Sequence, residues 1–485
     1  MDFSTAPPSL PSTPRVLRDI ADLPAPRGLP LLGNLLQVDR ARVHQSVERW
    51  CHEYGPFFRF RLAGRRYLVV ADHEALTAVL RDRPDGFERT ARLRDVWLEM
   101  GLPNGVFGAE GEAWRRQRRM VMAGFDPAHV KAYFPALLKV VQRLRGRWQK
   151  AARERAAIPL QADLMRFTVD AITGLAFGAD INTLESNHGV IQHHLDKIFP
   201  ALFRRVLSRL PYWRCVRLPV DRELDRSVAA VNTTIQGFVA SARERMRADP
   251  TRRERPQNLL EAMIAAADQG DSGVDDRDVA GNVLTMLLAG EDTTANTLAW
   301  MIHLLHRNPP ALQNAQDEVR RVAPDAAAFS PEQMGGLAYL EACAHETMRL
   351  KPVAPFIALQ ARRDTTIADI RVPRGTIIWG VMRRDSVDPS HFPNPQAFDP
   401  ARWLADGPPG HAASSAKRVS MPFGAGPRVC PGRYLALLEI KMVMAMLLAH
   451  FDFESVAAPG GGEAEELLAF TMAPLGVQMR LRERP

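Results

Sequence analysis

Hydrophobic positions recur at three- and four-residue intervals along most of the chain, the spacing that places apolar side chains on one face of a helix. This pattern predicts helices over residues 42–54, 130–155, 160–177, 228–248 and 279–306. Short runs rich in β-branched and aromatic residues predict strands over residues 57–62, 65–72, 366–372, 376–382 and 476–481. The balance predicts a mainly α-helical fold with a minor β-sheet region.

The chain has one proline-rich stretch near its start and no later linker. Residues 1–23 contain no apolar run of signal-peptide length and fall well short of the about 20 apolar residues that span a bilayer. We therefore expect a flexible leader over residues 1–23, no membrane anchor, and a single domain over residues 24–485. The glycine-rich polar segment 407–415 is expected to form a surface loop.

The amino-acid composition argues against several classes of protein. A chain of 485 residues with 46% hydrophobic content can bury a large core, which argues against a disordered or fibrous protein. Its four cysteines, Cys51, Cys215, Cys343 and Cys430, form no CxxC pair and have no regular spacing. This argues against a disulfide framework and a zinc ribbon, and it favours a reducing, cytoplasmic location.

The formal net charge of +8 comes mostly from arginine. Such an excess suits an acidic surface or nucleic acid. Because the sequence contains no nucleic-acid-binding motif, an acidic protein partner or an anionic substrate is the better interpretation, and no nucleic-acid partner is expected.

The first stretch with candidate chemistry is FGAGPRVCPG, which begins at Phe423. Its glycines permit a tight turn, and Gly432 lets a helix begin directly after Cys430. A cysteine at a helix N-terminus is favoured as thiolate by the macrodipole and the free N–H groups. A thiolate there is a nucleophile or a metal ligand, and the spacing alone leaves both open beside the simpler interpretation of a small buried cysteine.

The ordered set Phe423, Gly426, Arg428, Cys430 and Gly432 resembles the haem-binding loop of the cytochrome P-450 family, the haem-thiolate monooxygenases. The resemblance extends from about residue 24 to the end of the chain. It implies haem b with the thiolate of Cys430 as axial ligand. It also implies the fold of that family, with a long central helix over the haem and the cysteine loop on the proximal side.

The second stretch is AGEDTTANTLAW, which begins at Ala289 in an apolar helix. An acid and two threonines are unfavourable there, because a carboxylate loses hydration and hydroxyls compete for backbone hydrogen bonds. A polar stripe facing solvent is the alternative, which the apolar run before it disfavours. The stretch resembles the oxygen-activation motif of the same family, which implies that Asp292 and Thr293 are catalytic and supply protons to bound dioxygen, and that Ala289 and Gly290 border the haem. We assign no role to Glu291.

Trp114 and Arg118 are four residues apart and share a helix face. Alone they indicate no more than an amphipathic surface helix. They match a WxxxR segment of the family, which implies that both contact the haem propionates, with Arg428 as a third donor. One departure is Leu359, five residues before Asp364, where many family members place another arginine for a propionate.

Glu346 and Arg349 are three residues apart on one predicted helix face, where an isolated pair would be a solvated ion pair. With Arg402 downstream they resemble the buried Glu-Arg-Arg cluster of the family, which supports the region around the haem loop. The implied role is structural.

The resemblance also places a substrate pocket in several apolar segments. Its candidate residues are Phe87, Val96, Trp97, Phe199, Leu202, Val353, Phe356, Ile357 and Met472. A hydrophobic substrate follows, such as a fatty acid, terpenoid, steroid or polyketide. Nearby arginines offer capture of a carboxylate, although solvated surface arginines are the simpler interpretation. They are Arg89, Arg92, Arg94, Arg204 and Arg205.

The implied reaction inserts one atom of dioxygen into the substrate by hydroxylation or epoxidation. Nothing resembling a flavin or iron–sulfur domain follows the cysteine helix. We therefore expect electrons to come from NAD(P)H through a reductase and a separate ferredoxin or flavodoxin. That partner is expected to dock on a basic face formed by Arg115, Arg116, Lys417, Arg418 and Arg433. A monomer is expected.

Two other classes of function remain open. A haem-thiolate ligand-binding or sensor protein would bind haem through the same loop. A peroxide-driven peroxygenase would usually lack the Asp-Thr pair that Asp292 and Thr293 provide.

Overall fold

The computed structural model describes residues 17–125, 131–186, 190–325, 329–404 and 413–484. Helices dominate it. They are α1 Val43–Tyr54, α2 His73–Arg81, α3 Ala91–Glu99, α4 Gly111–Gly124, α6 Phe134–Arg153, α7 Leu160–Phe177, α8 Val190–Leu195, α9 Ile198–Leu207, α10 Pro219–Ala248, α11 Leu259–Ala267, α12 Asp276–His306, α13 Pro309–Val322, α14 Pro331–Gly335, α15 Ala338–Leu350, α16 Ala413–Ser420 and α17 Arg433–His450. The predicted mainly α-helical fold is confirmed.

The strands are short. They are β1 Arg18–Asp19, β2 Phe57–Leu62, β3 Arg65–Val70, β4 Phe87–Arg89, β5 Ile158–Pro159, β6 Phe356–Ala361, β7 Thr365–Ile367, β8 Ile370–Val372, β9 Ile377–Val381, β10 Phe451–Ala457, β11 Glu466–Leu468, β12 Met472–Pro474 and β13 Gln478–Glu483. The largest sheet has the order β2-β3-β9-β6-β4, with β3 and β9 parallel and the other pairs antiparallel. It brings N-terminal strands beside strands that lie about 300 residues later.

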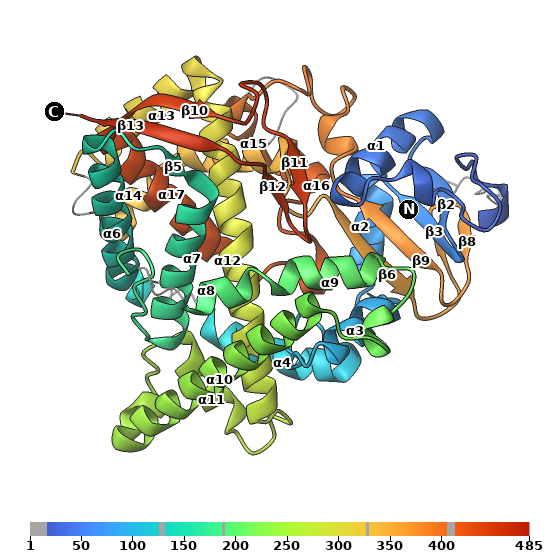
Figure 1. Ribbon diagram of the computed structural model, residues 1–485, viewed down its shortest axis with the longest axis horizontal. Coiled ribbons are helices and arrows are strands. Elements are labelled where there is room, and N and C mark those ends of the chain that lie inside the picture. The colour runs from blue at the N-terminus through green and yellow to red at the C-terminus, as the bar shows by residue number, and fades with distance from the viewer. Residues whose placement is uncertain (1–16, 126–130, 187–189, 326–328, 405–412, 485) are drawn as a thin grey trace, which may run out of the picture.

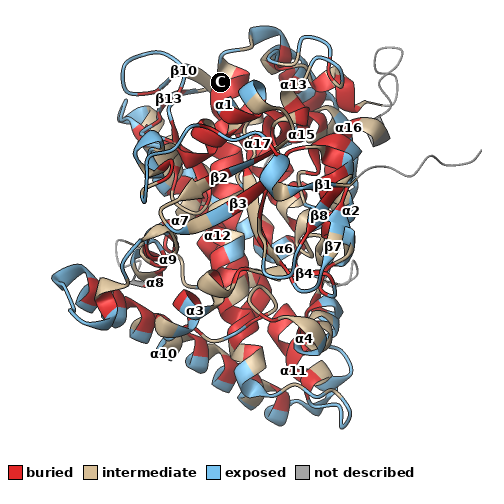
Figure 2. Ribbon diagram, turned by 90° about the vertical axis from the view of Figure 1, so that its right-hand side faces the viewer, coloured by how far each residue is buried: buried red, intermediate tan, exposed pale blue. Residues whose placement is uncertain are grey.

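Helix α12 runs through the middle of the molecule, with the largest sheet and α1 on one side and α6, α7 and α17 on the other (Figure 1). It is buried along most of its length, whereas α10 at the edge alternates buried and exposed positions (Figure 2). A helix that is apolar on nearly all sides belongs in the interior. The central position of α12 therefore follows from its sequence. None of the described helices is long and apolar enough to cross a membrane.

Several helices and strands begin or end at other residues than predicted. Helix α10 begins at Pro219, nine residues before the predicted start, because Pro219 occupies the first helical turn and the Asp221 carboxylate accepts a hydrogen bond from the N–H of Leu218. The charged residues of this first segment hide its helical periodicity. The predicted strand 366–372 is instead a hairpin of β7 and β8, with Ala368 at a φ of 52° between them.

The predicted leader over residues 1–23 is too long. Arg18 and Asp19 form β1, which pairs with β8, and Leu23 is buried against the sheet. Residues 1–16 lie outside the described part. The predicted surface loop 407–415 falls outside it up to residue 412, and from Ala413 the chain is helical.

Candidate functional site

Cys430 follows a tight loop that precedes α17. The N–H of Cys430 donates to the carbonyl of Phe423 at 3.0 Å, which closes the loop. Gly424 and Gly426 have φ values of 74° and 71°, the left-handed region that favours glycine. A Cβ on Gly426 would lie 2.5 Å from the carbonyl oxygen of Leu80 in α2. Gly426 is therefore needed for close approach to α2.

The thiol of Cys430 lies at the beginning of α17, as predicted. The N–H of Gly432, the residue that caps the helix, hydrogen-bonds to it. Burial raises the pKa of the Cys430 thiol, while this bond and the charges of Arg118 and Arg433 oppose the rise. A bound metal ion would deprotonate the thiol outright.

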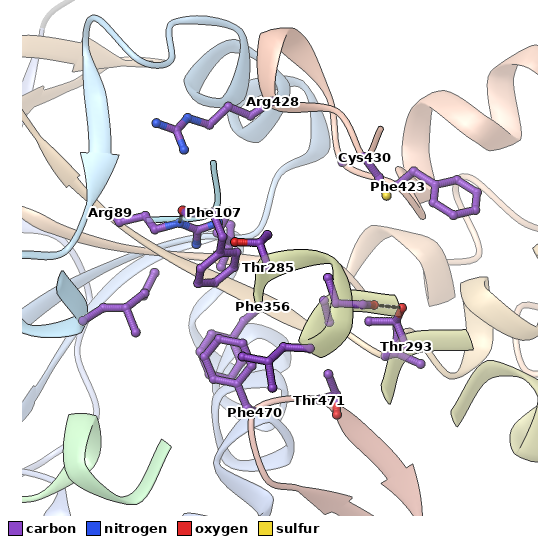
Figure 3. A pocket seen from close by; sticks show the side chains of 18 of the residues that line it. Arg89, Phe107, Thr285, Thr293, Phe356, Phe423, Arg428, Cys430, Phe470 and Thr471 are labelled. Carbon is purple, nitrogen blue, oxygen red and sulfur yellow. Dashed lines mark hydrogen bonds between the residues drawn. The ribbon is translucent and has the colours of Figure 1, made fainter. Parts of the chain in front are cut away.

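Cys430 lines a cavity of about 800 Å³, within the range of ligand sites. Ala289, Gly290 and Thr293 of α12 line the same cavity. The Thr293 hydroxyl donates to the carbonyl of Ala289 at 2.7 Å (Figure 3). A Cβ on Gly290 would lie 3.2 Å from the side chain of Ile172 in α7, so this glycine lets the two helices pack closely.

Trp114, Arg118 and Arg428 line one end of the cavity together with Cys430. Arg118 Nη2 donates to the carbonyl of Val429 at 2.8 Å. The guanidinium of Arg428 lies over the Trp114 ring, 4.8 Å from its centroid. The structure thus brings the three predicted donors together.

Two further arginines, buried Arg83 and partly buried Arg89, lie beside Arg428, and we did not assign either to the cofactor from sequence. Glu110 is the acid that faces them. Its carboxylate accepts from Arg428 Nη2 and from the backbone N–H of Arg89, the latter at 2.9 Å. Burial lowers the pKa of Arg83 to about 10, and burial together with Arg83 lowers that of Arg428 to about 9. Buried nitrogens of Arg83 and Arg428 have no hydrogen-bond partner among the described residues, although Arg83 Nη2 lies 3.9 Å from Glu110.

Three neighbouring guanidiniums against the one carboxylate of Glu110 leave a surplus of positive charge, which two haem propionates fit. Arg89 of β4 lies directly opposite Leu359 of β6. Residues opposite one another on paired strands project to the same face of a sheet. Arg89 therefore supplies a guanidinium beside Leu359, the position at which many family members have an arginine. Figure 3 shows Arg89 and Arg428 on one side of the cavity.

Glu346, Arg349 and Arg402 form a buried cluster. Arg349 binds Glu346 through two nitrogens, each at 2.7 Å, and Arg402 Nε lies 3.3 Å from Glu346. Trp403 Nε1 also donates to Glu346, at 2.8 Å. The remaining donors of Arg349 bond to backbone carbonyls, including that of Ser386 at 2.6 Å. The solvated ion pair that we considered from sequence is excluded.

Asp292 and Glu291 point to different neighbours. Asp292 accepts hydrogen bonds from Thr471 and, at 3.4 Å, from Asn296. Glu291 is 3% exposed, and its side chain meets the carboxyl of Asp196, which follows α8. Burial is the main cause that raises the pKa of both α12 acids.

Replacement of Glu291 by glutamine should make the free energy of unfolding decrease less as the pH rises. The pKa of Glu291 is raised in the folded protein, by burial and then by Asp196 and Asp292. The folded chain keeps a proton that the unfolded chain releases above about pH 4.3, so stability falls as pH rises. The wild type should lose up to about 1.4 kcal/mol per pH unit more than E291Q. Urea unfolding between pH 5 and 8 measures this.

The control for this prediction is Glu244→Gln, because Glu244 is exposed on α10. E244Q should keep the pH dependence of the wild type. If the free energy of unfolding changed with pH in the same way in E291Q and E244Q, Glu291 would not be protonated in the folded protein.

Five of the nine residues predicted for the substrate pocket line the cavity. They are Trp97, Phe199, Val353, Phe356 and Ile357. Four other predicted residues do not line it, because their helices and strands turn them into the packed core; they are Phe87, Val96, Leu202 and Met472.

Aromatic residues one or two positions from the predicted ones line the cavity instead. Phe203 follows Leu202, and Phe470 lies two residues before Met472. Phe470 stacks on Phe199 with 4.5 Å between ring centroids. Phe107 also lines the cavity, and Phe107, Phe356 and Phe470 lie together in Figure 3. The period of an amphipathic helix identifies a face only within one residue, which explains these misses.

Comparison with known proteins agrees with this geometry. The family model described as Cytochrome P-450 matches residues 23–480. The chain is 26% identical over 461 residues to human Cytochrome P-450 4X1, covering 90% of this chain and 86% of that protein. It is 26% identical to the mitochondrial 25-hydroxyvitamin D-1 alpha hydroxylase of Mus musculus, covering 90% and 88%. It is also 26% identical to the chloroplastic protein LUTEIN DEFICIENT 5 of Arabidopsis thaliana, covering 84% and 68%.

The cavity joins a cysteine just before α17 to the acid–threonine stretch of α12, and a cysteine thiolate is the haem ligand of cytochromes P-450. The chain belongs to the cytochrome P-450 family. It is an oxidoreductase of the monooxygenase class, and the family implies haem with cysteine ligation.

Proposed function

We propose that this protein inserts one atom of dioxygen into a C–H bond or double bond of a hydrophobic small molecule. The observation that carries the proposal is one cavity that Cys430 and Thr293 line from two different elements, with aromatic side chains between them. Four cysteines occur in the described residues and all are free, which supports the proposed cytoplasmic location.

When bound, haem supplies the activation of dioxygen, with electron density from the thiolate favouring cleavage of its O–O bond. Among the four cysteines, Cys430 is the one that lines the cavity, which makes it the proposed ligand. Trp114, Arg118 and Arg428 would hold the propionates. The buried cluster of Glu346, Arg349 and Arg402 would fix the backbone around the loop.

Proton supply is the proposed role of Asp292 and Thr293. Thr293 lines the cavity. Its hydroxyl, which donates to the carbonyl of Ala289, can donate instead to an oxygen atom bound in the cavity. The carboxyl of Asp292 is next in sequence, and it accepts hydrogen bonds from Thr471 and Asn296, which hold it in place. A positioned acid–hydroxyl pair typically contributes about 10²–10⁴-fold to a proton-transfer step.

Replacement of Thr293 by alanine tests the function. T293A should still bind substrate, while product formation with a surrogate reductase falls roughly 10²-fold and the consumed oxygen appears as hydrogen peroxide. Oxygen uptake, peroxide and product are measured together. Thr285→Ala is the control, because Thr285 lies two turns earlier on the same cavity wall. A wild-type protein that binds haem but consumes no oxygen would support a sensor, and peroxide-driven product alone would support a peroxygenase.

The electron donor is proposed to be a separate acidic protein. Lys417 and Arg418 are exposed on α16, and exposed Tyr434 lies beside Arg433 near the cysteine loop. Arg115 is less available, because it pairs with Asp85 at 2.7 Å. This chain covers 41% of the length of one relative, the Self-sufficient cytochrome P-450 monooxygenase CYP505E5 of Aspergillus niger.

Replacement of Arg89 by glutamine should weaken haem binding without destabilising the haem-free protein. A charge-assisted hydrogen bond to a propionate would be lost, which corresponds to about 10–100-fold in haem affinity. In the haem-free protein the same change relieves the repulsion between Arg83 and Arg89 but removes the hydrogen bond from Arg89 Nε to the carbonyl of Phe107, and these two effects on stability oppose one another. Haem transfer to an acceptor protein and urea unfolding of the haem-free chain measure the two effects. The control is Arg94→Gln, since Arg94 lies off the cavity; equal haem loss in both variants would contradict the role of Arg89.

A further inference from the structure

Two histidines and an aspartate converge at the start of α2, outside the cavity that contains Cys430. His73 is the first residue of α2, Asp385 begins the short 3-10 helix Asp385–Val387, and His391 lies in the loop that follows. One ligand atom from each residue lies within 4.8 Å of the other two. Among the described residues this is the one group of three histidines, cysteines or acids with that spacing.

The carboxylate of Asp385 faces both imidazoles. Its Oδ2 atom lies 2.8 Å from His73 Nδ1 and 3.9 Å from His391 Nε2. The two rings lie edge to face, with 4.8 Å between their centroids. Ligands of a tetrahedral zinc ion lie about 2.0–2.2 Å from the ion, which places them roughly 3.3–3.6 Å from one another. The two separations from Oδ2 bracket this spacing, so small side-chain rotations would bring the three atoms onto one ion.

The cluster is buried on one side and open to solvent on the other. His73 and Asp385 are buried, whereas the side chain of His391 is 30% exposed. An ion can therefore enter past His391, and water can supply the fourth ligand, as it does in zinc sites with three protein ligands. Two imidazole nitrogens and one carboxylate oxygen suit Zn²⁺, whereas Mg²⁺ and Ca²⁺ prefer oxygen ligands.

The neighbouring charges favour a cation at this position. Arg384 Nη1 binds Oδ1 of Asp385 at 2.5 Å, and Arg384 Nη2 lies 3.5 Å from Asp388. Two carboxylates against one guanidinium leave a negative charge, which attracts a divalent cation. The backbone N–H of His73 donates to Oδ2 at 2.8 Å, so the carboxylate is held in place by outer contacts on both oxygens. The proton between His73 and Asp385 would be released when the ion binds.

We propose that His73, Asp385 and His391 bind a zinc ion. The ion would link the start of α2 to the segment that follows β9. The other end of α2 closely approaches Gly426 of the cysteine loop, so bound zinc would also stabilise the surroundings of the cofactor. This site is separate from the reaction proposed above and does not depend on it.

Calorimetric titration of Zn²⁺ into the haem-loaded protein tests the site. The parent and the variants all carry Cys215→Ser, because the thiol of Cys215 is free and exposed and would itself bind zinc. The parent should bind one ion per chain. His391→Ala should weaken binding at least about 100-fold, since loss of a ligand costs more than loss of an outer partner. Zinc should raise the Tm of the parent and leave that of H391A unchanged, because an ion that binds only the folded chain stabilises it.

His52→Ala is the matched control, because His52 is exposed on α1 and is not part of the cluster. H52A should bind zinc as tightly as the parent. A parent that binds no zinc, or equal zinc affinity in the parent and H391A, overturns the site. If H391A lowers the Tm by the same amount with and without zinc, the three residues form only a hydrogen-bonded cluster, and the proposal is wrong.

Discussion

Replacement of Cys430 by serine is expected to abolish thiolate ligation and turnover. A hydroxyl is a far weaker ligand than a thiolate, and it cannot supply the electron density that favours O–O cleavage. The loss of activity should exceed the roughly 10–100-fold that follows from removing an outer partner of a metal ligand. The absorption band of the reduced carbon-monoxide complex that marks thiolate ligation should disappear as well.

Cys343→Ser is the control for this result. Cys343 is buried in α15, and burial raises the pKa of its thiol well above the usual range, so it is suited to packing rather than ligation. Its replacement should leave the carbon-monoxide band intact. A thiolate band that persists in C430S would show that another cysteine holds the iron.

Replacement of Glu346 by glutamine is expected to have the second largest effect, on folding. Glu346 and Arg349 are both fully buried, and Glu346 also accepts from Arg402 and Trp403. Removing one charge leaves the guanidiniums uncompensated, which costs roughly 3 to 5 kcal/mol. Urea unfolding of the haem-free protein measures this directly, and haem incorporation during expression should fall in parallel.

The matched control is Glu341→Gln, on the same helix. Glu341 pairs with Lys441 at 3.0 Å but is about one third exposed, so its ion pair is partly screened by solvent. E341Q should therefore cost about 1 kcal/mol or less. Similar losses in E346Q and E341Q would contradict a special role for the buried cluster.

The parts of the site that depend on local backbone could be predicted from sequence. The turn before Cys430 and the start of α17 follow from glycines and a helical pattern within ten residues. The apolar surroundings of Thr293 place that residue inside a buried helix. Glu346 and Arg349 share a helix face by spacing alone.

The parts that depend on strand pairing or on the exact face of a helix could not be predicted. Arg89 reaches the cofactor region because β4 pairs with β6, which is about 270 residues later in the chain. Arg65 of β3 and Arg92 of α3 lie near one another because both donate to carbonyls at the end of α9. Leu202 and Phe203 differ by one position, and only the packing of α9 decides which of them faces the cavity.

The opposition of Arg89 and Leu359 makes the charge at this edge of the sheet a property of two strands. Residue 359 alone would indicate a missing guanidinium, whereas the facing residue on the neighbouring strand carries one. A single substitution at residue 359 therefore does not decide the charge of this region, because the two facing positions contribute to it together.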